Sequence, residues 1–160
     1  MHTKVTTRQE LASRLEERRR QGQRIVFTNG CFDLMHIGHI RYLQAARNLG
    51  DVLVVGVNSD ESVRALNKGT DRPIVPDAQR AEVLAALACV DYVVTFSEPD
   101  PGALIATLQP DILVKGGDWS VDRIVGRETV EARGGHVQTI PLVPGVSTTT
   151  LVQRIRSTTA

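Results

Sequence analysis

The sequence has little cysteine, little net charge and no long hydrophobic run. Its 160 residues include two cysteines, Cys31 and Cys89, too few and too far apart for a disulfide framework, so both are expected to be reduced thiols. The 19 basic and 18 acidic side chains give a net charge of +1, which argues against binding to nucleic acid or an anionic membrane. No apolar run approaches the roughly 20 residues of a membrane span, and the polar N-terminus lacks the apolar core of a signal peptide. We therefore expect a cytoplasmic protein with no nucleic-acid or membrane partner.

What is present is the composition of a globular protein, with 41% apolar and 23% charged residues. After a first helix at 7–22, short apolar strands alternate with helical patterns. The strands are continuously apolar, which is typical of a parallel sheet covered on both faces. Strands are expected at 24–30, 51–58, 91–96, 111–117 and 136–143, and helices at 38–50, 59–69, 77–90, 100–110 and 147–156, with a further helix inside 122–135 that ends at Gly134. We predict a single α/β Rossmann-like doubly wound domain, with a five-stranded parallel sheet and helices on both faces.

Two common nucleotide-binding motifs are missing. The segment TNGCFD, which follows the first predicted strand, lacks the spacing of GxGxxG, and GxxxxGK[ST] does not occur. A Rossmann dinucleotide-binding protein and a P-loop protein are therefore disfavoured.

Residues suited to binding phosphate nevertheless follow the predicted strands. Ligands of open parallel sheets bind beyond the carboxyl ends of the strands, so these residues are expected to meet at one edge. Gly30 and Gly38 would let the backbone approach a ligand, and the helix that starts near Gly38 would favour an anion. His36 and His39 can point toward the same anion from one helical turn. Hydroxyl groups and positive charges could come from Ser147, Thr148, Thr149, Lys68, Lys115 and Arg80.

Other interpretations of the same residues stay open. The two histidines could be structural, or could ligate zinc together with Cys31 and Asp33. Lys68 could be a solvated helix end. The Ser147–Thr149 hydroxyls could be helix caps, although capping and phosphate binding coexist at one helix start. Arg72 is either a phosphate contact or a loop charge.

Two motifs carry a resemblance to a known family. CFDLMHIGHIRYLQAA contains the HxGH signature of the cytidylyltransferase-like nucleotidyltransferases, and GVSTTTLV resembles their second, C-terminal signature. HxGH alone also occurs in pantetheine-phosphate adenylyltransferases and class I aminoacyl-tRNA synthetases. Together with TNGCFD, VGVNSDESV, RPIVP and DILVKGGDW, the pattern from about Arg24 to Ile155 is similar to the D-glycero-β-D-manno-heptose 1-phosphate adenylyltransferases in their stand-alone form.

The resemblance implies a reaction. Residues 1–160 would form a single nucleotidyltransferase domain, with an N-terminal helix at 7–22 and a catalytic core at 24–155. The enzyme would transfer AMP from ATP to heptose 1-phosphate, giving ADP-heptose and pyrophosphate for lipopolysaccharide or S-layer sugar synthesis. A sugar phosphate is mostly dianionic at neutral pH, so no general base is required. Mg²⁺ would be bound by the phosphates and would need few protein ligands, and a homo-oligomer is expected.

The resemblance also assigns roles to residues. His36, His39 and Lys68 would be catalytic, the histidines as donors to the phosphates. The nucleotide would lie against Thr28, Asn29, Gly30, Phe32, Gly38, Lys115, Asp118, Ser147, Thr148 and Thr149. The acceptor would contact Asp33, Asp60, Lys68 and Arg80.

Two departures from the family pattern leave alternatives open. Asn67 is one residue more than the usual Leu-Lys-Gly and could displace Lys68. Trp119 stands where the nearest relatives often have Tyr, whereas glycerol-phosphate cytidylyltransferases show a similar Asp-Trp. The alternative is therefore a cytidylyltransferase acting on glycerol 3-phosphate or another small phosphate monoester. A nucleotide sensor without catalysis and a flavodoxin-like electron carrier are rivals of a different class.

Overall fold

Five parallel strands form one sheet in the order β3-β2-β1-β4-β5 in the computed structural model, which describes residues 3–66, 69–117 and 119–158. The strands are β1 (Ile25–Gly30), β2 (Val52–Asn58), β3 (Tyr92–Phe96), β4 (Ile112–Gly116) and β5 (His136–Ile140). β1 lies in the middle, paired with β2 on one side and β4 on the other, so the strand order reverses at β1. The predicted doubly wound sheet is confirmed.

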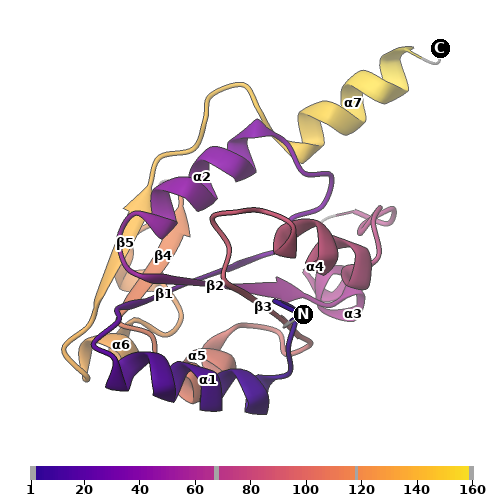
Figure 1. Cartoon of the computed structure of the whole chain (residues 1–160). Coiled ribbons are helices and arrows are strands. Elements are labelled where there is room, and N and C mark those ends of the chain that lie inside the picture. Colours follow the sequence, from indigo (N-terminus) through magenta and orange to yellow (C-terminus); the bar gives the residue numbers. More distant parts are fainter. Residues whose placement is uncertain (1–2, 67–68, 118, 159–160) are drawn as a thin grey trace.

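Helices cover both faces of the sheet (Figure 1). Helices α1 (Arg8–Arg20), α5 (Gly102–Leu108) and α6 (Arg127–Glu131) pack on one face, and α2 (Ile37–Arg47) and α4 (Asp77–Ala85) pack on the other. The short helices α3 (Asp60–Ala65) and η1 (Val121–Arg123) lie in connections, and α7 (Thr148–Thr158) projects from the body. Among the residues that the structure describes, no helix has the length and apolar character needed to cross a membrane.

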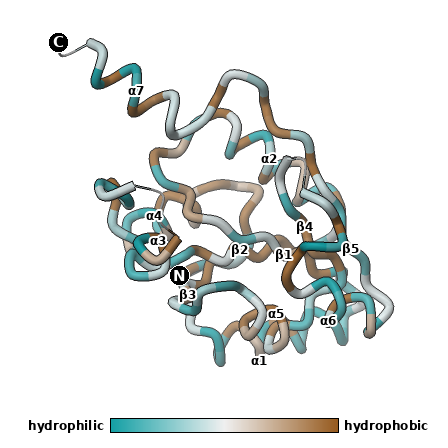
Figure 2. The backbone as a smooth tube through the Cα atoms, turned by 180° about the vertical axis from the view of Figure 1, so that it is seen from behind, coloured by the Kyte–Doolittle hydropathy of each residue, from teal (hydrophilic) through white to brown (hydrophobic). Residues whose placement is uncertain are grey.

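The continuously apolar strands explain the two-sided core. Ile25 and Phe27 of β1 pack in the cluster that contains α1 and α5, whereas Val26 between them packs with α2 and α4. All seven residues of β2 are buried, as expected for a strand with helices above and below it. Figure 2 shows the same layers from behind, coloured by hydropathy.

Most helices are shorter than the predicted segments, and the differences are largest at α3, α4 and α6. The segment 122–135, predicted to contain a helix that ends at Gly134, holds α6, which begins at Arg127 after the N-cap residue Gly126 and ends at Glu131; the φ of Gly126 is 89°, in the left-handed region. α4 ends at Ala85, and the turns that follow bring the Asp91 carboxylate within 2.8 Å of the Leu53 amide, beside β2. α3 ends at Ala65, before the predicted boundary at 69.

The segment before α1 extends the sheet at its β3 edge, which the sequence did not indicate. Val5 forms a parallel bridge with Val93, and the Thr6 amide donates to the Val93 carbonyl at 3.0 Å. α1 then begins with a capping box, in which the Thr7 and Glu10 side chains each accept from the other residue's amide at 3.3 Å.

Candidate active site

A pocket of about 550 Å³ opens at the carboxyl ends of β1 and β4, where the strand order reverses. Its wall contains residues from the end of β1, the loop and first turns of α2, the end of β4 and the segment that leads into α7. The residues predicted from the sequence that line it are Asn29, Gly30, Phe32, Asp33, His36, Gly38, His39, Ser147, Thr148 and Thr149. Thr28, Asp60, Arg80 and Lys115 are not among its lining residues, and Lys68 and Asp118 lie outside the described residues.

The two histidines stack on each other at the start of α2. His36 is the N-cap residue, and its Nδ1 accepts a hydrogen bond of 3.1 Å from the Gly38 amide. The His36 and His39 ring centroids are 3.9 Å apart, with 25° between the ring planes. A Cβ atom on Gly38 would lie 2.9 Å from the His36 ring, so the glycine makes room for that ring. The sequence had suggested instead that Gly38 lets the backbone approach a ligand.

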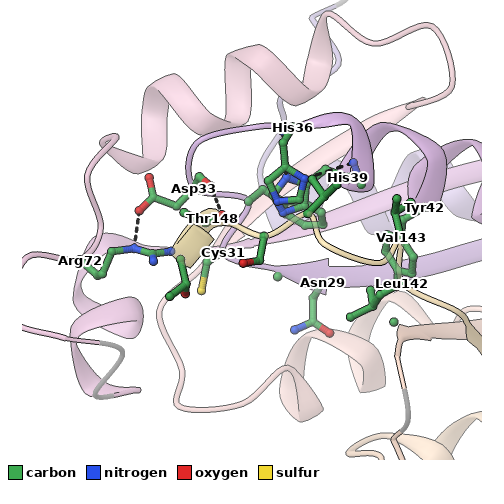
Figure 3. Close-up of a pocket in the computed structure, with 17 residues that line it drawn as sticks. Asn29, Cys31, Asp33, His36, His39, Tyr42, Arg72, Leu142, Val143 and Thr148 are labelled. Carbon is green, nitrogen blue, oxygen red and sulfur yellow. Dashed lines mark hydrogen bonds and ion pairs between the residues drawn. The ribbon is translucent and has the colours of Figure 1, made fainter. Parts of the chain in front are cut away.

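Both rings are held in the neutral form. Burial lowers the pKa of His36, and burial together with the neighbouring His36 lowers the pKa of His39 to about 4. The Nδ1 atoms accept from backbone amides, for His39 from the His36 amide at 3.4 Å. A neutral imidazole carries one proton, so this arrangement leaves the proton on Nε2 of each ring. The pair can therefore donate two N–H groups to an anion (Figure 3).

The start of α7 meets the histidine loop across the pocket. The Ser147 hydroxyl accepts from the Thr150 amide at 3.0 Å, and the Ser147 carbonyl accepts from the Leu151 amide at 3.1 Å, which caps the helix. The Thr148 hydroxyl donates to the Asp33 carbonyl at 2.7 Å. The N-termini of α2 and α7 thus both open onto the pocket, and unpaired amides at helix starts favour an anion.

Asp60 and Arg80, predicted to contact the acceptor, form hydrogen bonds with other parts of the protein. The Arg80 side chain is 1% exposed and donates to the carbonyls of Val75 and Cys31 at 2.8 and 2.5 Å and to the Asp60 carboxylate at 2.8 Å. Asp60 and Asp77 each accept from the other's amide at 2.9 and 3.0 Å, which ties α3 to α4. Their direct contact with an acceptor stays a prediction.

Asp33 and Arg72 form an ion pair at the pocket wall. The buried Asp33 carboxylate accepts from Arg72 Nε at 2.8 Å. Burial alone would raise the pKa of Asp33, but hydrogen bonds from the Ile74 and Val75 amides and from Arg72 outweigh it, and the pKa is lowered. Sequence reasoning left Arg72 undecided, and the structure places it in the pocket wall.

A second polar group lies around the ends of β1 and β4. Lys115, whose pKa burial lowers to about 8, donates through Nζ to the Asn29 amide oxygen. The buried Thr28 hydroxyl lies 2.6 Å from the Tyr42 hydroxyl, which donates to the Val114 carbonyl at 3.3 Å. Tyr42 also lines the pocket, and it was not among the site residues predicted from the sequence. Its position three residues after His39 was the available signal, because residues three apart lie on the same face of a helix.

The described residues contain no cluster of three or more His, Cys, Asp or Glu side chains that could hold a metal ion, so they give no support to the zinc interpretation. Within the described residues, Cys31 and Cys89 form no disulfide.

Comparison with known proteins identifies similar chains. The family model described as cytidylyltransferase-like matches residues 27–154. The chain is 55% identical over 153 residues to the bifunctional protein HldE of Syntrophotalea carbinolica, a match that covers 96% of the chain and 31% of that protein. It is 53% identical over 152 residues to HldE of Geobacter sulfurreducens, covering 95% of the chain and 31% of that protein. The chain thus spans about a third of the length of these relatives.

Solved structures share the fold. A lipopolysaccharide core biosynthesis protein from Thermoplasma volcanium has a TM-score of 0.63 and 30% identity, and the match covers 76% of the chain and 98% of that protein. The pantoate-beta-alanine ligase of Francisella tularensis has a TM-score of 0.59 at 17% identity, with 86% of the chain and 66% of that protein covered. At that identity the likeness concerns the fold alone.

Proposed function

The chain belongs to the cytidylyltransferase-like family, and from that premise we propose that it transfers AMP from ATP to heptose 1-phosphate, releasing ADP-heptose and pyrophosphate. The product would serve lipopolysaccharide or S-layer sugar synthesis. One observation carries the proposal: the histidines of HIGH and the Ser147–Thr149 segment line one pocket, at the N-termini of two helices. The similarity to proteins named HldE and to a lipopolysaccharide core biosynthesis protein supports heptose 1-phosphate as the acceptor.

The proposed step is an in-line displacement at phosphorus. An oxygen of the acceptor phosphate forms a bond to the α-phosphorus of ATP, while the bond from that phosphorus to pyrophosphate breaks and pyrophosphate leaves with the electron pair. The second pKa of a phosphate monoester is about 6, so the acceptor is already a dianion at pH 7 and no proton has to be removed. The protein therefore has to position two anions and stabilise the charge that develops.

The residues of the pocket suit those two tasks. We infer that the Nε2–H groups of His36 and His39 donate to phosphate oxygens around the reacting phosphorus. The Ser147–Thr149 segment would hold the β- and γ-phosphates, where the α7 N-terminus faces the pocket. Asn29, with its Lys115 partner, would face the nucleoside. Roles for Lys68 and Asp118 remain predictions from the sequence.

Mg²⁺ is proposed to enter with the phosphates of ATP. Mg²⁺ prefers oxygen ligands and keeps several waters, so it needs few protein ligands beside a triphosphate. The single-domain organisation, the cytoplasmic location and the homo-oligomer likewise stay predictions of the sequence.

A crossed substrate assay tests the proposed function. Initial rates of pyrophosphate release are measured for ATP and CTP, each paired with heptose 1-phosphate, glycerol 3-phosphate or phosphopantetheine. The expected result is the highest kcat/KM for ATP with heptose 1-phosphate. A higher value for CTP with glycerol 3-phosphate would reverse the assignment, and nucleotide binding without turnover would favour a sensor.

A further inference from the structure

Arg72 brings a fixed positive charge to the pocket, on the loop that precedes α4. We infer that Arg72 binds a phosphate group of the substrates and that Asp33 is the positioning residue that holds its guanidinium in place. This inference rests on the proposed function and adds a specificity-determining contact to it.

The Asp33 carboxylate is a rigid anchor. Its side chain has no exposed surface, and the carboxylate accepts three hydrogen bonds, from Ile74 N at 2.8 Å, Val75 N at 2.9 Å and Arg72 Nε at 2.8 Å. The Asp33 carbonyl also accepts from the Thr148 hydroxyl, so the same residue ties the Arg72 loop to the start of α7. The position of Arg72 is therefore fixed before any ligand binds, which lowers the entropy cost of binding.

Only one of the three guanidinium nitrogens of Arg72 binds to Asp33. Its ion pair with Asp33 runs through Nε, and within the described residues the two terminal nitrogens have no hydrogen-bond acceptor and are not sealed from solvent. The side chain is 14% exposed. In Figure 3 the guanidinium extends toward the middle of the pocket. Arg80 differs, because each of its three nitrogens donates to a protein oxygen.

The charges around the pocket favour such a group. Arg72 is the one lysine or arginine among the described lining residues, and the pKa values of His36 and His39 are lowered, so those rings carry no charge at neutral pH. ATP and a sugar phosphate together carry several negative charges. A guanidinium whose two terminal nitrogens have no acceptor among the described residues can donate to two phosphate oxygens in a planar fork, a fixed geometry that the ammonium group of a lysine does not offer.

Two phosphate groups could occupy this position, the terminal phosphates of ATP or the phosphate of the acceptor. In Figure 3 Arg72 and Asp33 lie at one end of the view and Tyr42 at the other, with Thr148 and the histidines between them and Asn29 below the histidines. Either substrate would supply the same chemistry, a phosphate dianion within reach of the guanidinium.

Binding measurements on the full chain test the inference. Isothermal titration calorimetry gives Kd values for ATP, pyrophosphate and heptose 1-phosphate with the wild type and Arg72→Gln. Loss of a charge-assisted contact should raise the Kd of the contacted ligand by about 10- to 100-fold. A rise for ATP and pyrophosphate identifies the terminal phosphates, and a rise for heptose 1-phosphate identifies the acceptor. Kd values of Arg72→Gln within about two-fold of the wild-type values for all three ligands would overturn the inference.

The role of Asp33 has its own test, in which the sign is diagnostic. If Asp33 acted only through its charge, Asp33→Asn would strengthen phosphate binding by removing a negative charge. A positioning role predicts the opposite, a Kd raised by about five-fold or more, with less than about a two-fold further change in the Arg72→Gln background. An equal effect in both backgrounds would rule out positioning.

Two controls separate these outcomes from a general loss of positive charge and from unfolding of the variants. Arg41→Gln removes one positive charge from the exposed face of α2, away from the pocket, and should leave all three Kd values unchanged. Thermal melts establish that each variant is folded. If the wild type binds ATP but makes no ADP-heptose, the proposed function fails, while the ATP and pyrophosphate titrations still decide the role of Arg72.

Discussion

Single residues determine what the histidine pair can do. His36 and His39 stack at 3.9 Å, each ring is held neutral, and each Nδ1 accepts from a backbone amide. A neutral ring with its proton on Nε2 donates a hydrogen bond but supplies no permanent charge. The pair therefore suits stabilisation of phosphate oxygens by preorganised donors.

Nuclear magnetic resonance measures the protonation state and the tautomer of the two histidine rings directly. Long-range ¹H–¹⁵N correlation spectra at pH 7 should show both rings as the neutral Nε2–H tautomer, and His39 should stay neutral at pH 6 because its pKa is about 4. An imidazolium signal from His39 at pH 6, or an Nδ1–H tautomer, would contradict this account.

The same shift predicts a pH dependence of stability. The pKa of His39 is about 4 in the folded chain, against 6.5 for a free histidine, so the unfolded chain binds more protons between these values. The stability contributed by His39 is therefore present above pH 6.5 and is lost as the pH falls toward 4. His39→Ala should flatten this part of the curve of unfolding free energy against pH, and an unchanged curve would count against the shift.

Replacement of one ring tests its catalytic role. His39→Ala removes one preorganised donor and should lower kcat by roughly 10²–10³, without loss of the fold. His136→Ala is the matched control, because His136 is exposed at the start of β5 and outside the pocket. A well-folded His39→Ala variant with near wild-type kcat would exclude the ring from the chemistry.

At the scale of elements, the site depends on the starts of α2 and α7. The sequence predicts both helices, since each begins after a short apolar strand and a polar or glycine-containing segment. It also predicts the five strands, because continuously apolar runs such as VLVVGV fit a strand buried on both faces. The bounds of α4 and α6 were predicted less well, because the turns after α4 are held by a tertiary contact of Asp91 and α6 begins after a left-handed backbone angle at Gly126.

The candidate site was predictable only in part, for a related reason. The motifs around His36 and Ser147 are local in sequence and could be recognised. The Asp33–Arg72 ion pair joins residues 39 positions apart, and the partners of Arg80 lie 5, 20 and 49 positions from it. Such pairings depend on the folded arrangement, so the sequence alone indicated neither the partners of Arg80 nor the anchor that holds Arg72.

The cap of α7 gives a prediction for that element. None of the described α7 side chains is fully buried, so the helix depends strongly on its own hydrogen bonds. Ser147→Ala removes the acceptor for the Thr150 amide and should cost about 1 kcal/mol locally. Hydrogen exchange of the first α7 amides should become about five-fold faster, whereas Ser157→Ala at the other end should leave them unchanged. Equal protection in both variants would show that the cap contributes little.

At the scale of the whole molecule, Arg80 connects the loop after β1, the Arg72 loop and α3 through one buried guanidinium. Arg80→Met keeps most of the side-chain volume but leaves Asp60 without its cation and two carbonyls without this donor. Breaking such a pair should lower the free energy of unfolding by about 3 kcal/mol.

Urea unfolding measures this loss, with Arg41→Met as the control because Arg41 is exposed. An unchanged unfolding midpoint together with weaker binding of heptose 1-phosphate would instead support the original expectation that Arg80 contacts the acceptor.

The proposed function requires transfer of the nucleotidyl group, AMP with its α-phosphorus, to the sugar phosphate, and not transfer of the terminal phosphate of ATP. Reactions with ATP labelled with radioactive phosphorus at either the α or the γ position, followed by product separation, test it most directly. We expect the α label to appear in ADP-heptose and the γ label in pyrophosphate, in equal amounts. Transfer of γ label to the sugar, or release of γ label as orthophosphate with no ADP-heptose formed, would contradict it.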